Sequence, residues 1–322
     1  MAIRDKGGAA EAKAAAAVGS GALASEATHV GAGATVLQPV ARSQWQLFRR
    51  RFFKHKVAVA AGVVLLLLYL SAIFAGQVTR YPLNPNIAQT QAQAGPSASH
   101  WFGTDELGRD QFTRIIYAGR ISLAIGLSVA VVSTAVGSLI GAAAGYFGRW
   151  ADQLLMRLTD LFLVVPALAI LLIAQKKFGG SVPVIIIVLS LLFWQYIARV
   201  VRGVFLSLKE KEFVEAARAS GASSWRIIFR HMLPNAIGPI AVNATLAVAL
   251  AILTESTLSF LGFGVRPPTV SWGNMLQQSE GAVGTSNAYL IYFPGLFILV
   301  TVMAVNFLGD GLRDAFDPQS KH

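Results

Sequence analysis

The side chains that could do acid–base or metal chemistry are few in this chain of 322 residues, and they stand far apart. The five histidines do not form a helical zinc pair; they are His29, His55, His100, His231 and His322. The absence of cysteine excludes thiolate metal sites and thiol catalysis, and the absence of a Gly-Lys dipeptide excludes a Walker A phosphate loop. We therefore expect no catalytic residue, no metal site and no cofactor in this chain. It is not expected to be an enzyme.

The polar side chains with most functional interest lie in or beside long uncharged stretches. Glu255 ends one such stretch and is followed by Ser256 and Ser259, while Asn243 lies within the same stretch. A carboxylate at the centre of a bilayer costs about 2.5–3.5 kcal/mol on insertion scales, so such a group should face protein or water. The cluster could line an outer gate, although a plain interfacial position explains it equally well. Asn243 is a candidate pathway contact or interhelical hydrogen bond.

The elements that hold these groups are apolar helices. Hydrophobic residues make up 54% of the chain and charged residues 13%, about half the ~25% usual in globular proteins. Six stretches are long enough to cross a hydrocarbon core, which takes about 20 helical residues: 57–79, 121–148, 158–175, 178–198, 232–254 and 281–309. The third contains Asp160, one turn from Arg157, and we expect these two to form a structural ion pair. The pattern predicts an all-α integral membrane protein with six transmembrane helices.

The net charge of +11 could indicate nucleic acid or anionic lipid, but its distribution favours a topology signal. Of the 27 Lys and Arg residues, 20 fall in one of the two alternating sets of segments, including five between residues 49 and 56. The positive-inside rule places that set in the cytoplasm, together with both termini. We expect a multi-pass protein of a bacterial inner membrane, in contact with lipid and with no nucleic-acid partner.

The chain divides into three predicted regions. Residues 1–45 are rich in Ala and Gly and should form a disordered cytoplasmic tail, because they can bury little apolar surface. Residues 46–118 should hold the first transmembrane helix and an outer amphipathic loop. Residues 119–315 should form a core with five transmembrane helices.

Within that core, residues 209–234 form a long patterned connection that we call the docking loop. The pattern predicts a helix over residues 209–220, a left-handed Gly221, and a second helix that Ser223 or Ser224 caps and that runs to Met232. Small residues at 216, 217, 221 and 222 make little sense on a free surface, where long polar side chains would serve. They would let another backbone approach closely.

The string Glu215-Ala216-Ala217, then Gly221, then Leu233-Pro234 resembles the EAA loop of binding-protein-dependent ABC importer permeases. His231 departs from the family pattern, which often has Ile there. The resemblance implies docking on an ATPase subunit, with Glu215 as a polar contact, two alanines as a close-packing face and Gly221 as the turn. The full predicted docking set is Glu215, Ala216, Ala217, Arg218, Gly221, Ala222, Trp225 and Arg226.

A second segment, HWFGTDELGRDQFTRIIYAGRISL over residues 100–123, lies between the first two predicted spans. Thr104 can cap a helix, and the pairs Asp105 with Arg109 and Asp110 with Arg114 have helical spacing, so we expect a short amphipathic helix at the outer interface.

The order of residues in this segment resembles the GTDxLGRDxxSR stretch of C-type permease subunits from dipeptide, oligopeptide and nickel importers, with Thr113 in place of Ser. Residues 145–166 and 255–276 also resemble that family.

The resemblance implies a type I ABC importer permease fold and a permease subunit of an ATP-driven importer for dipeptides or oligopeptides. Nickel or glutathione are alternative substrates within the same class. The implied partners are a homologous B-type permease subunit, two ABC ATPase subunits that hydrolyse the ATP, and an extracytoplasmic substrate-binding protein. A gradient-driven secondary transporter would want inverted repeats and midplane carboxylates, and a membrane-embedded enzyme would want converging polar groups; the sequence shows neither.

Overall fold

The computed structural model describes residues 44–84 and 91–316, so the predicted tail lies almost entirely outside the described residues. The regular elements of the described part are helices, joined by loops, with one isolated β-bridge between Thr104 and Asp110. The chain from Gln44 onward clusters as a single unit. The predicted boundary between residues 118 and 119 falls inside a helix, α5, so the outer segment and the core share one continuous element.

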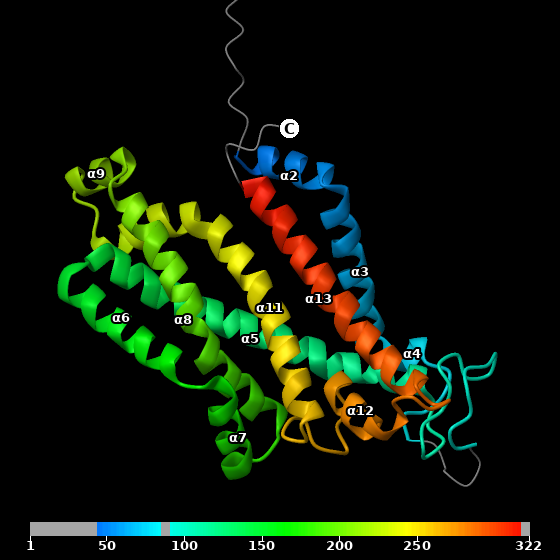
Figure 1. Ribbon diagram of the computed structural model, residues 1–322. Helices are drawn as coiled ribbons and strands as arrows, with labels where there is room; N and C mark the ends of the chain where they lie inside the picture. Colours follow the sequence, from blue (N-terminus) through cyan, green and yellow to red (C-terminus); the bar gives the residue numbers. More distant parts are fainter. Residues whose placement is uncertain (1–43, 85–90, 317–322) are drawn as a thin grey trace, which may run out of the picture. The chain divides into compact units, whose positions relative to one another are not determined.

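The helices follow one another along the chain as Figure 1 shows. They are α2 (Gln44–Lys54), α3 (Lys56–Ile73), α4 (Ala75–Val78), α5 (Gln111–Phe147), α6 (Arg149–Val164), α7 (Ala167–Phe178), α8 (Val182–Lys209), α9 (Glu212–Ala219), α10 (Ser224–Arg226), the π-helix η2 (Ile227–Met232), the 3-10 helix η3 (Leu233–Ala236), α11 (Ile237–Phe260), α12 (Trp272–Gln278), the 3-10 helix η4 (Glu280–Ala282) and α13 (Tyr289–Phe316).

Five helical stretches of the described residues are long and apolar enough to cross a membrane: α3, α5, α8, the run from Ser224 to Phe260, and α13. A sixth span is formed if α6 and α7, which meet at 78°, count as one broken span. The break lies at Pro166, which precedes α7 and cannot donate a backbone hydrogen bond to continue α6. The predicted count of six therefore includes this broken span.

Helix α5 packs closely against α8 over much of its length. Gly137, Gly141 and Gly145 repeat every fourth residue along the α5 face that meets α8. A Cβ added at Gly137 would lie 2.5 Å from the carbonyl oxygen of Trp194, and one at Gly145 would lie 2.6 Å from Cβ of Phe205. The two backbones are thus in direct contact, as small-residue repeats allow between membrane helices.

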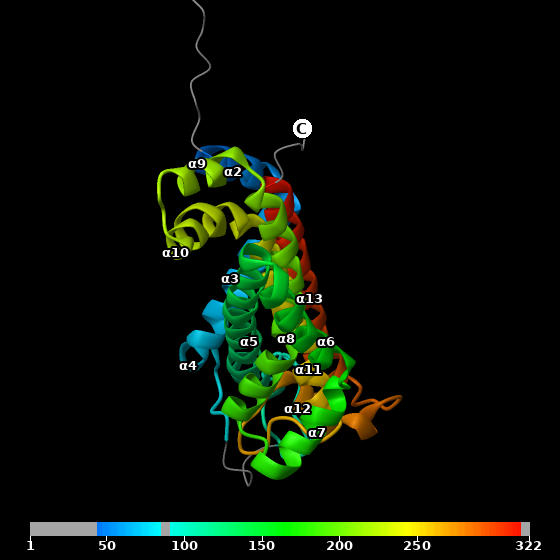
Figure 2. The same cartoon turned by 90° about the vertical axis from the view of Figure 1, so that its left-hand side faces the viewer.

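The bundle has two opposite ends, and different short helices lie at each. Helices α2 and α9 and the C-terminal end of α13 lie at one end, and α7 and α12 lie at the other, as both Figure 1 and Figure 2 show. We call these the α9 end and the α12 end. The docking loop belongs to the first, and the connection that follows Glu255 belongs to the second.

Candidate functional site

The first helix of the docking loop, α9, lies at the α9 end of the bundle (Figure 2). Val214 is the one buried residue of α9, and it joins the core formed with α5 and α8. Glu215, Ala216 and Arg218 are exposed. The side chains of Glu215 and Arg218 have no ion-pair partner among the described residues. This helix therefore offers a charged face flanked by small residues to anything that approaches from outside the chain.

The turn that follows α9 confirms the predicted left-handed glycine. Gly221 has a φ of +75°, and the backbone bonds from Gly221 N to the Arg218 oxygen (3.0 Å) and from Ala222 N to the Ala217 oxygen (3.1 Å) close the helix in a Schellman motif. A Cβ added at Gly221 would meet no atom within 4 Å. The conformation requires glycine, whereas the space around the turn is open to a partner.

The second helix of the docking loop is fixed to the bundle. Ser223 caps α10, because its Oγ accepts a hydrogen bond from Arg226 N at 3.4 Å. The predicted helix to Met232 is in fact a π-helix from Ile227 onward, a bulged geometry that the apolar pattern does not distinguish from an α-helix. Its residues Ile227 and Met232 are buried in the same core as Val214. The base of the loop is buried in the bundle, whereas most residues of α9 are exposed.

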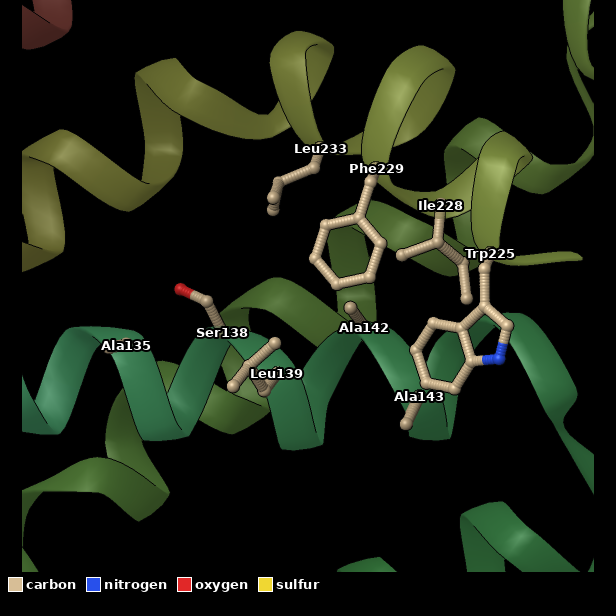
Figure 3. A pocket seen from close by; sticks show the side chains of 9 residues that line it. All are labelled: Ala135, Ser138, Leu139, Ala142, Ala143, Trp225, Ile228, Phe229 and Leu233. Atoms are coloured by element: carbon tan, nitrogen blue, oxygen red, sulfur yellow. The ribbon is translucent and has the colours of Figure 1, made fainter.

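An apolar cavity of about 230 Å³ lies between this second helix and α5. Figure 3 shows Trp225 and Phe229 turned toward α5, and their rings stack with centroids 5.8 Å apart. Trp225 is 60% exposed, so this predicted docking residue is available at the rim of the cavity. The lining residues are Ala135, Ser138, Leu139, Ala142, Ala143, Trp225, Ile228, Phe229 and Leu233.

The expected ion pair between Arg157 and Asp160 is wrong, because Asp160 pairs with Arg199 of α8, with Nη2 and Oδ1 2.5 Å apart. A second ion pair joins Asp152 of α6 to Arg202 of α8. Helix α6 therefore uses its carboxylates to hold α8 rather than its own next turn. Because these partners are separated by 39 and 50 positions, helical spacing within α6 could not have found them.

The predicted gate cluster lies inside the chain. Glu255 is fully buried, and Ser256 and Ser259 are 6% and 2% exposed. The carboxylate of Glu255 accepts hydrogen bonds from Ser259 Oγ at 2.7 Å and from Ser122 Oγ at 3.3 Å. An interfacial position is therefore wrong for Glu255, whereas its role at an outer gate stays a prediction. The sequence missed Ser122 because it lies on α5, far away along the chain.

Within residues 44–84 and 91–316, no hydrogen bond joins Asn243 to another helix. Its Nδ2 donates to the oxygen of Pro239 in the same helix at 2.9 Å, and the side chain is partly exposed. Its predicted role as a pathway contact stays a prediction.

The outer segment before α5 is a loop, so the amphipathic helix expected from Thr104 is wrong. Helix α5 begins only at Gln111, where Asp110 caps it by accepting a hydrogen bond from Thr113 N at 2.8 Å. The other oxygen of Asp110 lies 2.8 Å from Nδ1 of His100. Both oxygens of Asp110 are thereby used.

The ion pairs of this loop differ in part from those expected. The pair between Asp105 and Arg109 is confirmed, with Oδ2 and Nε 2.7 Å apart. Arg114 pairs with Asp105 rather than with Asp110, and its Nη2 donates to Oε1 of Gln278 on α12 at 2.7 Å. Arg114 is nearly buried, at 3% exposure. A guanidinium from α5 thus joins the outer loop to α12.

Comparison with known proteins gives consistent matches over most of the chain. Residues 137–322 match the family model described as binding-protein-dependent transport system inner membrane component, and residues 43–96 match that of the N-terminal transmembrane domain of oligopeptide transport permease C. A protein of Brucella suis biovar 1, described by name as a peptide permease, is 44% identical over 88% of this chain and 92% of its own.

Two further relatives carry more specific names. The dipeptide transport system permease protein DppC of Alkalihalophilus pseudofirmus is 39% identical over 88% of this chain and 93% of its own. The glutathione transport system permease protein GsiD of Pectobacterium atrosepticum is 38% identical over 87% of this chain and 93% of its own. A chain from an inward-facing structure of the MetNI methionine ABC transporter shares the fold, with a TM-score of 0.52, 20% identity, and coverage of 63% of this chain and 96% of that one.

Proposed function

This chain belongs to the family of binding-protein-dependent transport system inner membrane components, and we propose that it forms one half of the membrane pathway of an ATP-driven importer for short peptides. The family and the type I ABC importer permease fold support a transport role. The names of the relatives support the substrate class, because peptides, dipeptides and glutathione are all short peptidic molecules. Nickel is less favoured by those names.

The distribution of basic residues supports placing the α9 end in the cytoplasm. Both termini and the docking loop would then face the cytoplasm, and α12 would face the outside. The five basic residues between positions 49 and 56, next to α3, lie on the same side under this orientation.

The docking loop would bind an ABC ATPase subunit. The observation that carries this proposal is the contrast between its two helices: α9 buries one residue, Val214, with Ala217 packed against the same core, whereas the base buries Ile227, Ile228 and Met232 there. Glu215 and Arg218 would pair with charges of the ATPase, and Ala216 and Ala217 would let its backbone come close. A force on α9 would then pass through Val214 and Ala217 to the buried base of the loop.

The remaining subunits complete the path. Six spans enclose only part of a pore, so a homologous B-type permease subunit would supply the other half. Two ATPase subunits would bind and hydrolyse ATP, one at each docking loop, and an extracytoplasmic binding protein would deliver the peptide at the α12 end. Closure of the ATPases would rock the helices between inward-open and outward-open states.

Crosslinking tests the docking assignment directly, since the chain has no cysteine of its own. In the co-expressed complex, a cysteine at Ala217 should crosslink to a cysteine placed on the groove of the ATPase subunit. A cysteine at Glu280, which is exposed at the α12 end, is the matched control and should not react with the ATPase. Equal crosslinking from both positions, or none from Ala217, would refute the assignment.

Uptake of a labelled dipeptide into proteoliposomes that requires ATP and the binding protein tests the transport function.

A further inference from the structure

The buried carboxylate of Glu255 is bonded on both sides. Ser259 Oγ donates to Oε1 at 2.7 Å, and Ser122 Oγ donates to Oε2 at 3.3 Å. Ser259 lies one turn further along α11, and Ser122 lies on α5. One carboxylate therefore ties the end of α11 to α5. No ion pair reaches Glu255 from the described residues, so serine hydroxyls are the donors that satisfy it.

We call residues 261–272, the stretch between α11 and α12 with the first residue of α12, the outer connection. Each of the two serines also accepts a hydrogen bond from a backbone N–H of this outer connection. Val265 N donates to Ser259 Oγ at 3.1 Å, and Trp272 N donates to Ser122 Oγ at 3.2 Å. With an N–H on each serine oxygen, the hydroxyl hydrogen is directed to Glu255. Such chains of donors strengthen one another inside a protein. The carboxylate thus holds the outer connection through two serine relays.

Two glycines bring the backbone of the same region against α11. A Cβ added at Gly273 would lie 2.5 Å from both Cα and the oxygen of Ser256. A Cβ added at Gly264 would overlap Ser259. The relays are short because glycine removes the side chains that would otherwise separate the two backbones.

The outer connection and α11, which Glu255 joins, continue toward opposite ends of the bundle. Beyond the outer connection, Gln278 of α12 bonds Arg114, which pairs with Asp105 of the outer loop. In the other direction, α11 is the last part of a helical run of 37 residues from Ser224 to Phe260, which includes α10, η2 and η3. That run begins in the docking loop. Glu255 lies where the outer connection is attached to this helical run.

We propose that Glu255 is a positioning residue for transport: it fastens the outer connection to the helical run that begins in the docking loop, so that the two move together. This inference rests on the proposed function, because an ATP-driven importer needs its outer face to respond to the ATPase. The binding protein, docked at the outer face, would then signal to the ATPase through this attachment.

Spin-label distances test the attachment without requiring transport. Two cysteines are introduced and spin-labelled, one at Arg266 in the outer connection and one at Leu246 on α11. Both positions are exposed, and the chain has no other cysteine. In the complete complex, the native Glu255 should give one narrow distance distribution, and Glu255→Gln should broaden it, because an amide offers one acceptor oxygen instead of two. Thr257→Val is the matched control, since that exposed hydroxyl bonds only its own helix at Leu253. If Glu255→Gln is as narrow as Thr257→Val, the proposal is wrong.

Coupling is tested by the stimulation of ATP hydrolysis when the loaded binding protein is added to reconstituted complexes. We expect Glu255→Gln to reduce this stimulation at least about tenfold, the scale of one hydrogen bond to a charged group, while basal hydrolysis per assembled complex stays unchanged. Ser122→Ala removes one relay only and should give an intermediate loss, which keeps the test valid if Glu255→Gln fails to assemble. A parallel loss of basal and stimulated hydrolysis would indicate a merely structural role and overturn the proposal. If the native complex shows no peptide uptake at all, the proposed function fails, whereas the label distances still decide the attachment.

Discussion

Replacing Gly137 by alanine should force α5 and α8 apart. The added Cβ would lie 2.5 Å from the Trp194 oxygen, 2.8 Å from Cβ of Ile197 and 3.1 Å from Ala198 N. An ordinary carbon–oxygen contact is about 3.3–3.6 Å, so the helices would have to separate by about 1 Å. The neighbours are backbone and branched side chain, which cannot swing away. We expect a cost of about 1–3 kcal/mol, the usual range for overpacking.

The matched control is Gly203→Ala on α8, where an added Cβ meets nothing within 4 Å. Alanine improves helix propensity by about 1 kcal/mol at either position, so the difference between the two variants isolates the clash. The assay is the unfolding midpoint of each purified variant in the same detergent, measured against the parent. Gly203→Ala should equal or exceed the parent, and Gly137→Ala should fall below it by several degrees. If the two variants unfold together, the close approach of α5 and α8 does not govern stability.

Three further substitutions separate the sites described above. Gly221→Val should place a β-branched residue at a φ of +75°, at a local cost of about 1–2 kcal/mol. It should abolish ATP-driven uptake while lowering the unfolding midpoint no more than Gly137→Ala does; normal uptake would contradict the docking role. Arg114→Met should destabilise the protein by about 3–5 kcal/mol, because it leaves the carboxylate of Asp105 with one guanidinium partner fewer in a buried site; thermal unfolding measures this, and an unchanged midpoint would show that the cluster contributes nothing. Asp160→Asn should cost less than about 1 kcal/mol, since Asp160 and Arg199 are 47% and 52% exposed; a loss as large as that of Arg114→Met would refute this ranking.

Local features were predictable from the sequence where a single element determines them. Lipid selects long uncharged runs, so the spans could be located, and the left-handed turn at Gly221 follows from its place after a helix. The helix ends were less predictable, because α8 continues through Arg199, Arg202 and Lys209 beyond its uncharged part. Charge alone therefore does not show where a membrane helix stops.

The polar partners could not be predicted, because they come from elements that only the fold brings together. Helical spacing pairs Asp160 with Arg157 and Asp110 with Arg114, yet both carboxylates bind residues outside their own helical turns. Glu255 depends on Ser122, 133 positions away. Spacing rules describe neighbours on one helix, whereas a buried carboxylate is satisfied by whichever donors surround it in three dimensions.

The broken span formed by α6 and α7 has a consequence for how the protein is made. Its first half carries Asp152 and Asp160, and their partners Arg202 and Arg199 are synthesised 50 and 39 residues later. The ion pairs that fasten α6 to α8 cannot form before α8 is made, so we expect α6 to reach its final place only after the chain has been extended through α8. The broken span of α6 and α7 would then enter the membrane together with α8, as one hairpin instead of one helix at a time.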